Sequence, residues 1–224
     1  MIVHIARHGQ PALEGLPPDA NPELPPKDYP LSLLGRRQAR RLGEYLKGRG
    51  FHGKIISSPY VRTAETANIA ADVCGVEVFF EPRIQEMRFH PEPVCPGLTL
   101  EELRENFPHV SPAAVLAYPW MQPGGIETPE DVSVRVADFL AEFLADLPEE
   151  DVLLVGHGAS VVRLMRGLAE RAHCTGEQGT VWNCAVCSFA AEPDGAVRLL
   201  EPLHTRFLPP EDVTSNLRRP GDPV

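Results

Sequence analysis

Two histidines, each next to a glycine and each following an apolar run, are the residues of this chain that point most directly to chemistry. His8 lies in Arg-His-Gly-Gln after residues 2–6, and His157 lies in Gly-His-Gly after residues 151–155. A neutral imidazole is a nucleophile near pH 7, and a guanidinium beside it binds anions. Arg7 and His8 therefore indicate an anion site that contains a nucleophile. For the tripeptide alone, a basic turn at the end of a strand is an equal alternative.

The elements that would position these residues are strands that end just before them. Apolar and β-branched residues predict short buried strands over 2–6, 54–57 and 151–155. The second of these leads into Arg62, one turn inside the following helix. Because the carboxyl ends of parallel strands meet at one edge of a sheet, we expect His8, His157 and the two arginines to converge there.

Strand and helix patterns alternate along most of the chain, which predicts an α/β fold: a three-layer sandwich with a mostly parallel central sheet and helices on both faces. Ser32, Thr99 and Thr128 have the residue type and spacing of helix N-caps. Further strands are expected over 76–80, 181–190 and 196–200, and helices over 33–47, 59–73, from 99, 129–147 and 158–172.

No internal repeat and no dividing linker is evident, so residues 1–224 are expected to form a single domain. The polar, proline-rich tail at about 205–224 is expected to be loosely attached. Three proline-containing stretches, 11–30, 90–97 and 119–125, are expected loops that form the rim of the site and select the substrate.

Composition limits the classes of partner. The 224 residues are 43% hydrophobic and 23% charged, with a net charge of −10, which is typical of a globular protein and unfavourable for nucleic acid or an anionic membrane surface. No apolar run reaches the length of a membrane span, and the N-terminus resembles a strand rather than a signal peptide. We therefore expect a cytoplasmic protein, with a monomer and a homodimer both open.

Five cysteines lie at positions 74, 95, 174, 184 and 187, an odd number that favours reduced thiols. Cys184 and Cys187 form a CxxC close to His173, a spacing that a zinc site can use. The surrounding apolar residues favour a buried strand over a metal site. No metal and no cofactor is therefore expected.

At the same residues the chain resembles the histidine phosphatase superfamily, which includes cofactor-dependent phosphoglycerate mutases and many phosphatases. The resemblance rests on six motifs in the same order as in that family: RHGQ (7–10), LSLLGRRQA (31–39), SSPYVRTAETA (57–67), IQEMRF (84–89), GGIETPEDVSVR (124–135) and VLLVGHGASV (152–161). Glu14, His90 and Ile126 depart from the mutase pattern, and these departures bear on the substrate more than on the chemistry.

The resemblance and the residue types together imply a role for each site residue. His8 is the expected nucleophile, with its second ring nitrogen donating to a backbone carbonyl. Arg7, Arg62 and His157 are expected to hold the phosphoryl group, and Glu86 to act as acid and base. Further substrate contacts are expected at Gly9, Gln10, Ser57 and Gly158.

Several interpretations remain open beside these roles. Glu81, Glu92 and Glu127 are alternatives to Glu86 as the acid, although Glu86 fits the motif best. Asp131 and Arg135 have the spacing of a helix-surface ion pair, and the arginines at 36, 37, 40 and 41 that of a solvated helix face. The other five histidines, at positions 4, 52, 109, 173 and 204, are expected to be structural or exposed.

The function expected from these observations is a metal-independent phosphomonoesterase that acts on a small phosphorylated metabolite through a phosphohistidine. A mutase-type phosphotransferase is the second interpretation, less favoured because the mutase residues after Arg-His-Gly and around the acid are absent. A non-catalytic binding protein on the same fold and a CxxC metalloprotein are further alternatives.

Overall fold

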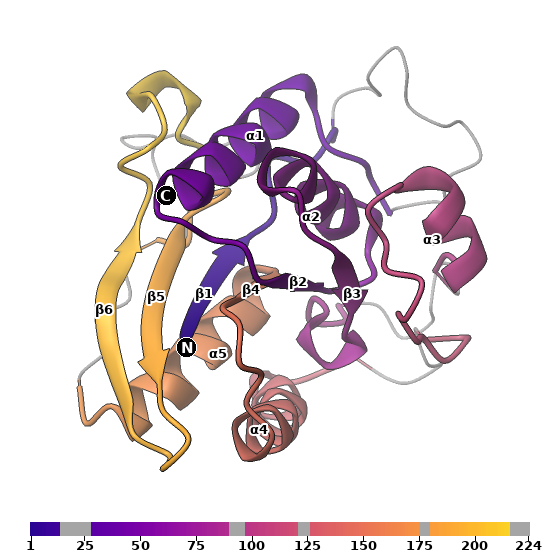
Figure 1. Ribbon diagram of the computed structural model, residues 1–224. Helices are drawn as coiled ribbons and strands as arrows, with labels where there is room; N and C mark the ends of the chain where they lie inside the picture. Colours follow the sequence, from indigo (N-terminus) through magenta and orange to yellow (C-terminus); the bar gives the residue numbers. More distant parts are fainter. Residues whose placement is uncertain (14–27, 90–96, 121–125, 175–179, 216–224) are drawn as a thin grey trace.

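The centre of the molecule is a mixed β-sheet, seen in a computed structural model that describes residues 1–13, 28–89, 97–120, 126–174 and 180–215 (Figure 1). Within these residues the sheet has six strands in the order β3-β2-β4-β1-β5-β6. Neighbours from β3 to β1 are parallel, whereas β5 and β6 are antiparallel to the strands beside them. The strands are β1 (Ile2–Arg7), β2 (Lys54–Ser57), β3 (Val78–Phe80), β4 (Val152–Gly156), β5 (Val186–Ala191) and β6 (Val197–His204).

Helices cover both faces of the sheet, as the alternation of patterns predicted (Figure 1). Helices α1 (Leu33–Gly48) and α2 (Val61–Cys74) pack on one face, and α4 (Pro129–Ala145) and α5 (Gly158–Arg171) on the other. Each face of the sheet has its own hydrophobic core. Because successive side chains of a strand point to opposite faces, Ala6 packs in the core under α1 and α2, whereas Val3 and Ile5 pack in the core under α4 and α5. The short helix α3 (Leu100–Asn106) packs near β3.

The predicted helix caps are confirmed. Ser32 accepts a hydrogen bond from the Gly35 amide, and Thr99 and Thr128 each form a capping box with the acidic residue three positions on. The predicted Asp131–Arg135 ion pair is wrong, because the Asp131 carboxylate accepts from Thr128 instead. The guanidinium of Arg135 donates to Glu127, with Nε and Oε1 2.9 Å apart.

Several element boundaries differ from those expected. Strand β5 begins at Val186 rather than 181, because the chain turns at Cys184, whose φ is 56°. Strand β3 begins at Val78 rather than 76, and β6 extends to His204 rather than to residue 200. Helix α2 begins at Val61 rather than 59, and α4 ends at Ala145 rather than 147.

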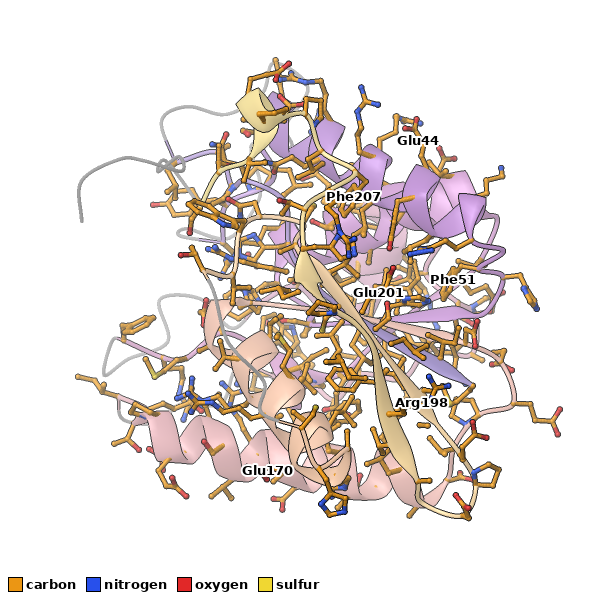
Figure 2. The ribbon with its side chains drawn as sticks, turned by 90° about the vertical axis from the view of Figure 1, so that its left-hand side faces the viewer. Glu44, Phe51, Glu170, Arg198, Glu201 and Phe207 are labelled. Carbon is orange, nitrogen blue, oxygen red and sulfur yellow. The ribbon has the colours of Figure 1, made fainter. Side chains whose placement is uncertain are left out.

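The expectation of a loosely attached tail is wrong for residues 205–215. The ring of Phe207 stacks on that of Tyr45 in α1 with centroids 4.8 Å apart, and it lies beside α1 in Figure 2. Leu208, Val213 and Thr214 are buried. The Thr214 carbonyl accepts from the Asn183 amide at 2.7 Å, so this segment is part of the fold. Residues 216–224 lie outside the described part.

The two CxxC cysteines are both buried, Cys187 in β5 and Cys184 in the turn before it. Burial raises the pKa of both thiols, which keeps them protonated and therefore poor metal ligands. Within the described residues, no group of three or more His, Cys, Asp or Glu side chains is arranged to hold a metal ion. None of the helices in the same residues is both long enough and apolar enough to cross a bilayer.

Candidate active site

Three neighbouring parallel strands end beside one another and bring the two sequence motifs together. The His8 amide donates to the Gly156 carbonyl at 3.0 Å, and the Ser58 amide donates to the Val155 carbonyl at 3.0 Å. The imidazole rings of His8 and His157 lie with centroids 5.2 Å apart and planes at 62°. The expected convergence of the two histidines at one edge of the sheet is therefore confirmed.

The contacts of His8 define which of its nitrogens can react. Its Nδ1 lies 2.6 Å from the Gly9 carbonyl oxygen, and since a carbonyl only accepts, Nδ1 must carry the proton. The lone pair is then on Nε2. Burial, with added effects of Arg7 and Arg62, holds the pKa of His8 well below its ordinary value. The ring is neutral at pH 7 and is competent as a nucleophile.

Gly9 lets the loop after β1 approach α1 closely. A Cβ at this position would lie 2.5 Å from the Gly35 carbonyl oxygen, so a larger residue would displace the helix. The Gly9 amide donates to Thr66 Oγ1 at 3.0 Å, and this hydroxyl donates to the Arg62 carbonyl at 2.7 Å. Thr66, which sequence analysis did not single out, thus connects the His8 loop to the helix that carries Arg62.

Arg7 is buried at the end of β1, and the C-terminal segment holds it in place. Its Nη1 donates to the Val181 carbonyl at 2.7 Å and to Ser215 Oγ at 2.9 Å. Burial lowers the pKa of Arg7, an effect that the nearby charge of Glu86 opposes. Arginine remains protonated in proteins, so a fixed positive charge lies at the end of this strand.

Arg62 lies in the first turn of α2, close to both histidines. Its guanidinium carbon is 4.5 Å from the ring centroid of Tyr60, and its Nη1 is 3.7 Å from Asp28 Oδ1. Burial is the largest cause of the lowered pKa of His8 and of His157, and the positive charges of Arg62 and Arg7 lower both further.

His157 is completely buried at the N-cap position of α5. Its Nε2 lies 2.9 Å from Ser58 Oγ, and its Nδ1 has no hydrogen-bond partner among the described residues. Burial is the largest of the effects that lower the pKa of His157, followed by the charge of Arg62. A neutral ring whose Nε2 accepts from Ser58 has a proton on Nδ1 to offer to an anion.

Glu86 lies where the start of α5 meets the segment after β3. Its Oε1 accepts from the Met87 amide at 2.9 Å and from the Ala159 amide at 3.3 Å, two residues beyond His157. Arg135 fixes the surrounding backbone by donating to the carbonyls of Arg83 and of Glu86, the latter at 3.2 Å. The carboxylate therefore lies at the first turn of α5, which begins directly after His157.

The alternative acids are engaged elsewhere or lie outside the described residues. Glu127 is buried and accepts from the Arg88 amide and from Arg135; burial raises its pKa, but these hydrogen bonds outweigh burial and bring the pKa below its ordinary value. A carboxyl group held ionised is a poor proton donor. Glu81 accepts from the amide and guanidinium of Arg83, and Glu92 falls in an undescribed segment.

Two of the three further predicted contact residues have side-chain hydrogen bonds within the protein. Gln10 Oε1 accepts from Ser32 Oγ at 2.8 Å, and Ser57 Oγ donates to the Ser58 carbonyl at 2.8 Å. Gly158 is the first residue of α5, with open space where a Cβ would lie. Their contacts with substrate remain predictions. Ser58, rather than Ser57, is the serine that touches His157, and strand alternation after Ser57 offered a signal for it.

One arginine of the expected solvated helix face is part of the fold. Arg36 Nε donates to Glu65 Oε1 at 2.6 Å, and Glu65 Oε2 accepts from the Leu31 amide at 2.7 Å. This pair links the start of α1 to α2. Arg37, Arg40 and Arg41 have side chains that are more than half exposed, in agreement with the expectation.

Comparison with curated proteins gives relatives of moderate similarity. The chain is 30% identical over 138 residues to a protein of Bacillus subtilis named uncharacterized phosphatase PhoE, a match covering 62% of this chain and 64% of that protein. It is 34% identical over 139 residues to the probable phosphoglycerate mutase GpmB of an Enterobacter species, covering 60% of each. The matched part thus spans less than two thirds of these relatives.

Solved structures match over most of the chain. A mycobacterial glucosyl-3-phosphoglycerate phosphatase in complex with inorganic phosphate has a TM-score of 0.60 at 25% identity, covering 93% of this chain and 99% of that one. The ecdysone phosphate phosphatase of Bombyx mori, solved with tungstate, has a TM-score of 0.65 at 19% identity, covering 90% of this chain and 92% of that one, and supports the fold alone.

A model of one protein family matches most of the chain. Residues 3–201 match the histidine phosphatase superfamily (branch 1), a range that includes both histidine motifs, Arg62 and Glu86. With the six motifs in order and the two imidazoles in contact, the chain belongs to the histidine phosphatase superfamily.

Proposed function

We propose that this protein is a metal-independent phosphomonoesterase that transfers the phosphoryl group of a small phosphorylated metabolite to His8 and then to water. The observation that supports it most is the protonation state of His8, which keeps its proton on Nδ1 for the Gly9 carbonyl and its lone pair on Nε2. The ring of His157 lies 5.2 Å away between centroids, and the charges of Arg7 and Arg62 act on His8, which supports a phosphate site made of these groups.

In the first step Nε2 of His8 attacks phosphorus while the bond to the alkoxide leaving group breaks. Charge spreads over the three other phosphoryl oxygens in such a transfer, and fixed cations and N–H donors lower the barrier most. Arg7 and Arg62 provide the charge, and Nδ1 of His157 provides a neutral donor. These groups need no metal ion to complete the set.

Glu86 completes the chemistry as acid and then base. It donates a proton to the departing alkoxide, and afterwards takes a proton from the water that attacks the phosphohistidine. The second step releases inorganic phosphate and restores neutral His8. The position of Glu86 beside the start of α5 supports this assignment over Glu127, whose carboxylate is bound by two arginines.

The substrate class is a small phosphorylated metabolite, in keeping with relatives whose names describe phosphatases. The expected rim is only partly described, because residues 14–27, 90–96 and 121–125 fall outside the described ranges. A cytoplasmic location and a homodimer remain predictions.

A mutase-type phosphotransferase is the second candidate, favoured by the relatives named probable phosphoglycerate mutase. Both reactions pass through a phosphohistidine, but a mutase returns the group to its substrate and requires a bisphosphorylated glycerate to keep His8 charged. A non-catalytic binding protein would hold inorganic phosphate and turn over neither substrate class.

The test is a panel of phosphorylated metabolites and p-nitrophenyl phosphate, assayed for released phosphate with and without 2,3-bisphosphoglycerate and EDTA. We expect hydrolysis that needs no bisphosphate and is unchanged by EDTA. Isomerisation of phosphoglycerate only when the bisphosphate is present would support the mutase instead. Loss of activity in EDTA that added metal restores would contradict the metal-independent mechanism.

A further inference from the structure

A buried carboxylate outside the proposed catalytic set lies against the start of α2. Asp28 is 1% exposed, and its Oδ1 accepts from the Val61 amide at 2.9 Å. The same oxygen lies 3.7 Å from Arg62 Nη1, and Arg62 is the only cation within 4 Å of Asp28 among the described residues. Its second oxygen has no hydrogen-bond partner there. A carboxylate is rarely buried so completely without a role for its charge.

The contact with Val61 explains only part of this burial. Tyr60, the N-cap residue of α2, makes no side-chain cap, so Asp28 supplies the missing acceptor from a distant part of the sequence. A neutral asparagine would cap the helix equally well. The charge therefore needs a second explanation, and its counterpart is Arg62.

Arg62 is held from two directions. Its guanidinium stacks over the Tyr60 ring, and Asp28 lies close to one of its terminal nitrogens. An arginine side chain loses much rotamer freedom when it binds an anion, and fixing it beforehand lowers that cost. Fixing it also keeps the charge where a transferring group needs it.

We propose that Asp28 is a positioning residue that caps α2 and orients the guanidinium of Arg62 toward the bound phosphoryl group. Asp28 does not touch the substrate and acts through Arg62. This inference rests on the proposed function, because it assigns Asp28 a part in the same phosphate site.

The electrostatics make the effect of Asp28 depend on pH. Burial raises its pKa to about 7, although the charge of Arg62 opposes the increase. Arg36 of α1 and Glu65 of α2 pair with each other at 2.6 Å, and these helices carry further charged side chains at positions 37, 40, 41, 44, 47 and 72. Ionised Asp28 holds Arg62 above this pKa, and protonation weakens the hold below it.

The experiment is a double-mutant cycle with Asp28→Asn, Arg62→Ala and both changes together. The measurements are kcat and KM for p-nitrophenyl phosphate and the Kd of inorganic phosphate, from about pH 5.5 to 8.5. Asp28→Asn keeps an acceptor for the Val61 amide and removes only the charge. Glu65→Gln is the matched control, since it removes another buried carboxylate of α2 whose ion pair is with Arg36.

We expect Asp28→Asn to lower kcat/KM and phosphate affinity by about tenfold above pH 7, and by less than about twofold in the Arg62→Ala background. The ratio of wild-type to Asp28→Asn kcat/KM should fall as the pH decreases through 7. Glu65→Gln should leave both kinetic constants within about twofold. If Asp28→Asn does not fold, Asp28→Glu takes its place, because it retains the charge on a longer side chain. This variant should raise KM more than it lowers kcat.

The inference is overturned if Asp28→Asn matches the active wild type at every pH, or if its effect is undiminished without Arg62. Unchanged kinetics in Asp28→Glu would overturn it equally. A wild type that neither hydrolyses phosphomonoesters nor binds phosphate would instead refute the proposed function, so the two failures are distinguishable.

Discussion

The imidazole rings of His8 and His157 lie 5.2 Å apart between centroids, although one follows the first strand of the chain and the other follows β4. The parallel pairing of β1 with β4, in which Arg7 is opposite Gly156, places the two strand ends side by side. The two rings have different contacts: Nδ1 of His8 faces the Gly9 carbonyl and carries the proton, whereas His157 has a serine at Nε2 and, among the described residues, no hydrogen-bond partner at Nδ1.

Replacing His8 by alanine should abolish the phosphorylated intermediate and reduce turnover by roughly 10³- to 10⁶-fold, the range for loss of a nucleophile. The measurement is incorporation of label from a ³²P-labelled monoester, quenched in alkali, where phosphohistidine survives. His52→Ala is the control, because His52 is exposed and its ring contacts only the Gly50 carbonyl among the contacts described. Retention of activity in His8→Ala would rule out the nucleophile assignment.

Replacing Ser58 by alanine should lower kcat/KM by up to about tenfold, because the hydrogen bond between its hydroxyl and Nε2 of His157 is lost. The comparison is with Ser57→Ala, which removes a hydroxyl that donates to the Ser58 carbonyl in the wild type. Steady-state kinetics of the two variants decide which serine supports the site. A larger loss in Ser57→Ala would favour Ser57 as the serine that contacts the substrate.

Glu86→Gln should reduce kcat/KM, which reports the first phosphoryl transfer, by roughly 10²- to 10⁴-fold for alkyl phosphates, whose leaving groups need a proton. The loss should be much smaller for p-nitrophenyl phosphate, because nitrophenolate departs without protonation. The readout is the ratio of the two rates in the variant and in wild type. An equal loss on both substrates would show that Glu86 is not the acid.

Glu127→Gln should act on stability instead. It removes the buried carboxylate that pairs with Arg135 and Arg88. Removing one member of a buried ion pair lowers the free energy of unfolding by roughly 3–5 kcal/mol. Chemical denaturation measures this loss. Unchanged stability together with a leaving-group-dependent loss of kcat/KM would transfer the acid role from Glu86 to Glu127.

His4 should make the fold sensitive to mild acid. It is buried in β1 against Ser188, and burial lowers its pKa from 6.5 to about 4. Because the folded state prefers the neutral ring, the contribution of His4 to the free energy of unfolding is complete above pH 6.5 and is lost as the pH falls toward 4. The slope is at most about 1.4 kcal/mol per pH unit for one group.

Urea unfolding between pH 6.5 and 5 measures this dependence before most carboxylates titrate. Burial also lowers the pKa of His8, His157 and His204, and it raises the pKa of Asp28 to about 7, which acts in the opposite direction, so the wild-type slope is a sum over several groups. His4→Gln should remove the contribution of His4 from this slope and leave the contributions of the other groups. An identical slope in wild type and His4→Gln would contradict the assignment.

Local sequence patterns are enough to predict most strands and helices and the site residues that lie at their ends. Apolar runs that end in Arg-His-Gly and Gly-His-Gly, with cap residues such as Ser32 and Thr128, are local signals, because strand burial and helix capping depend on residues close together in the chain. The parallel arrangement of strands then brought His8 and His157 to one edge, which the pattern predicted.

Only the tertiary structure decided which distant residues hold that site in place. Ser215 accepts a hydrogen bond from Arg7. Arg135 donates to the backbone around Glu86 rather than to Asp131. Asp28 caps a helix that starts at Val61. Each contact joins segments far apart in the chain, and its energy depends on burial and distance, which spacing along a sequence does not encode.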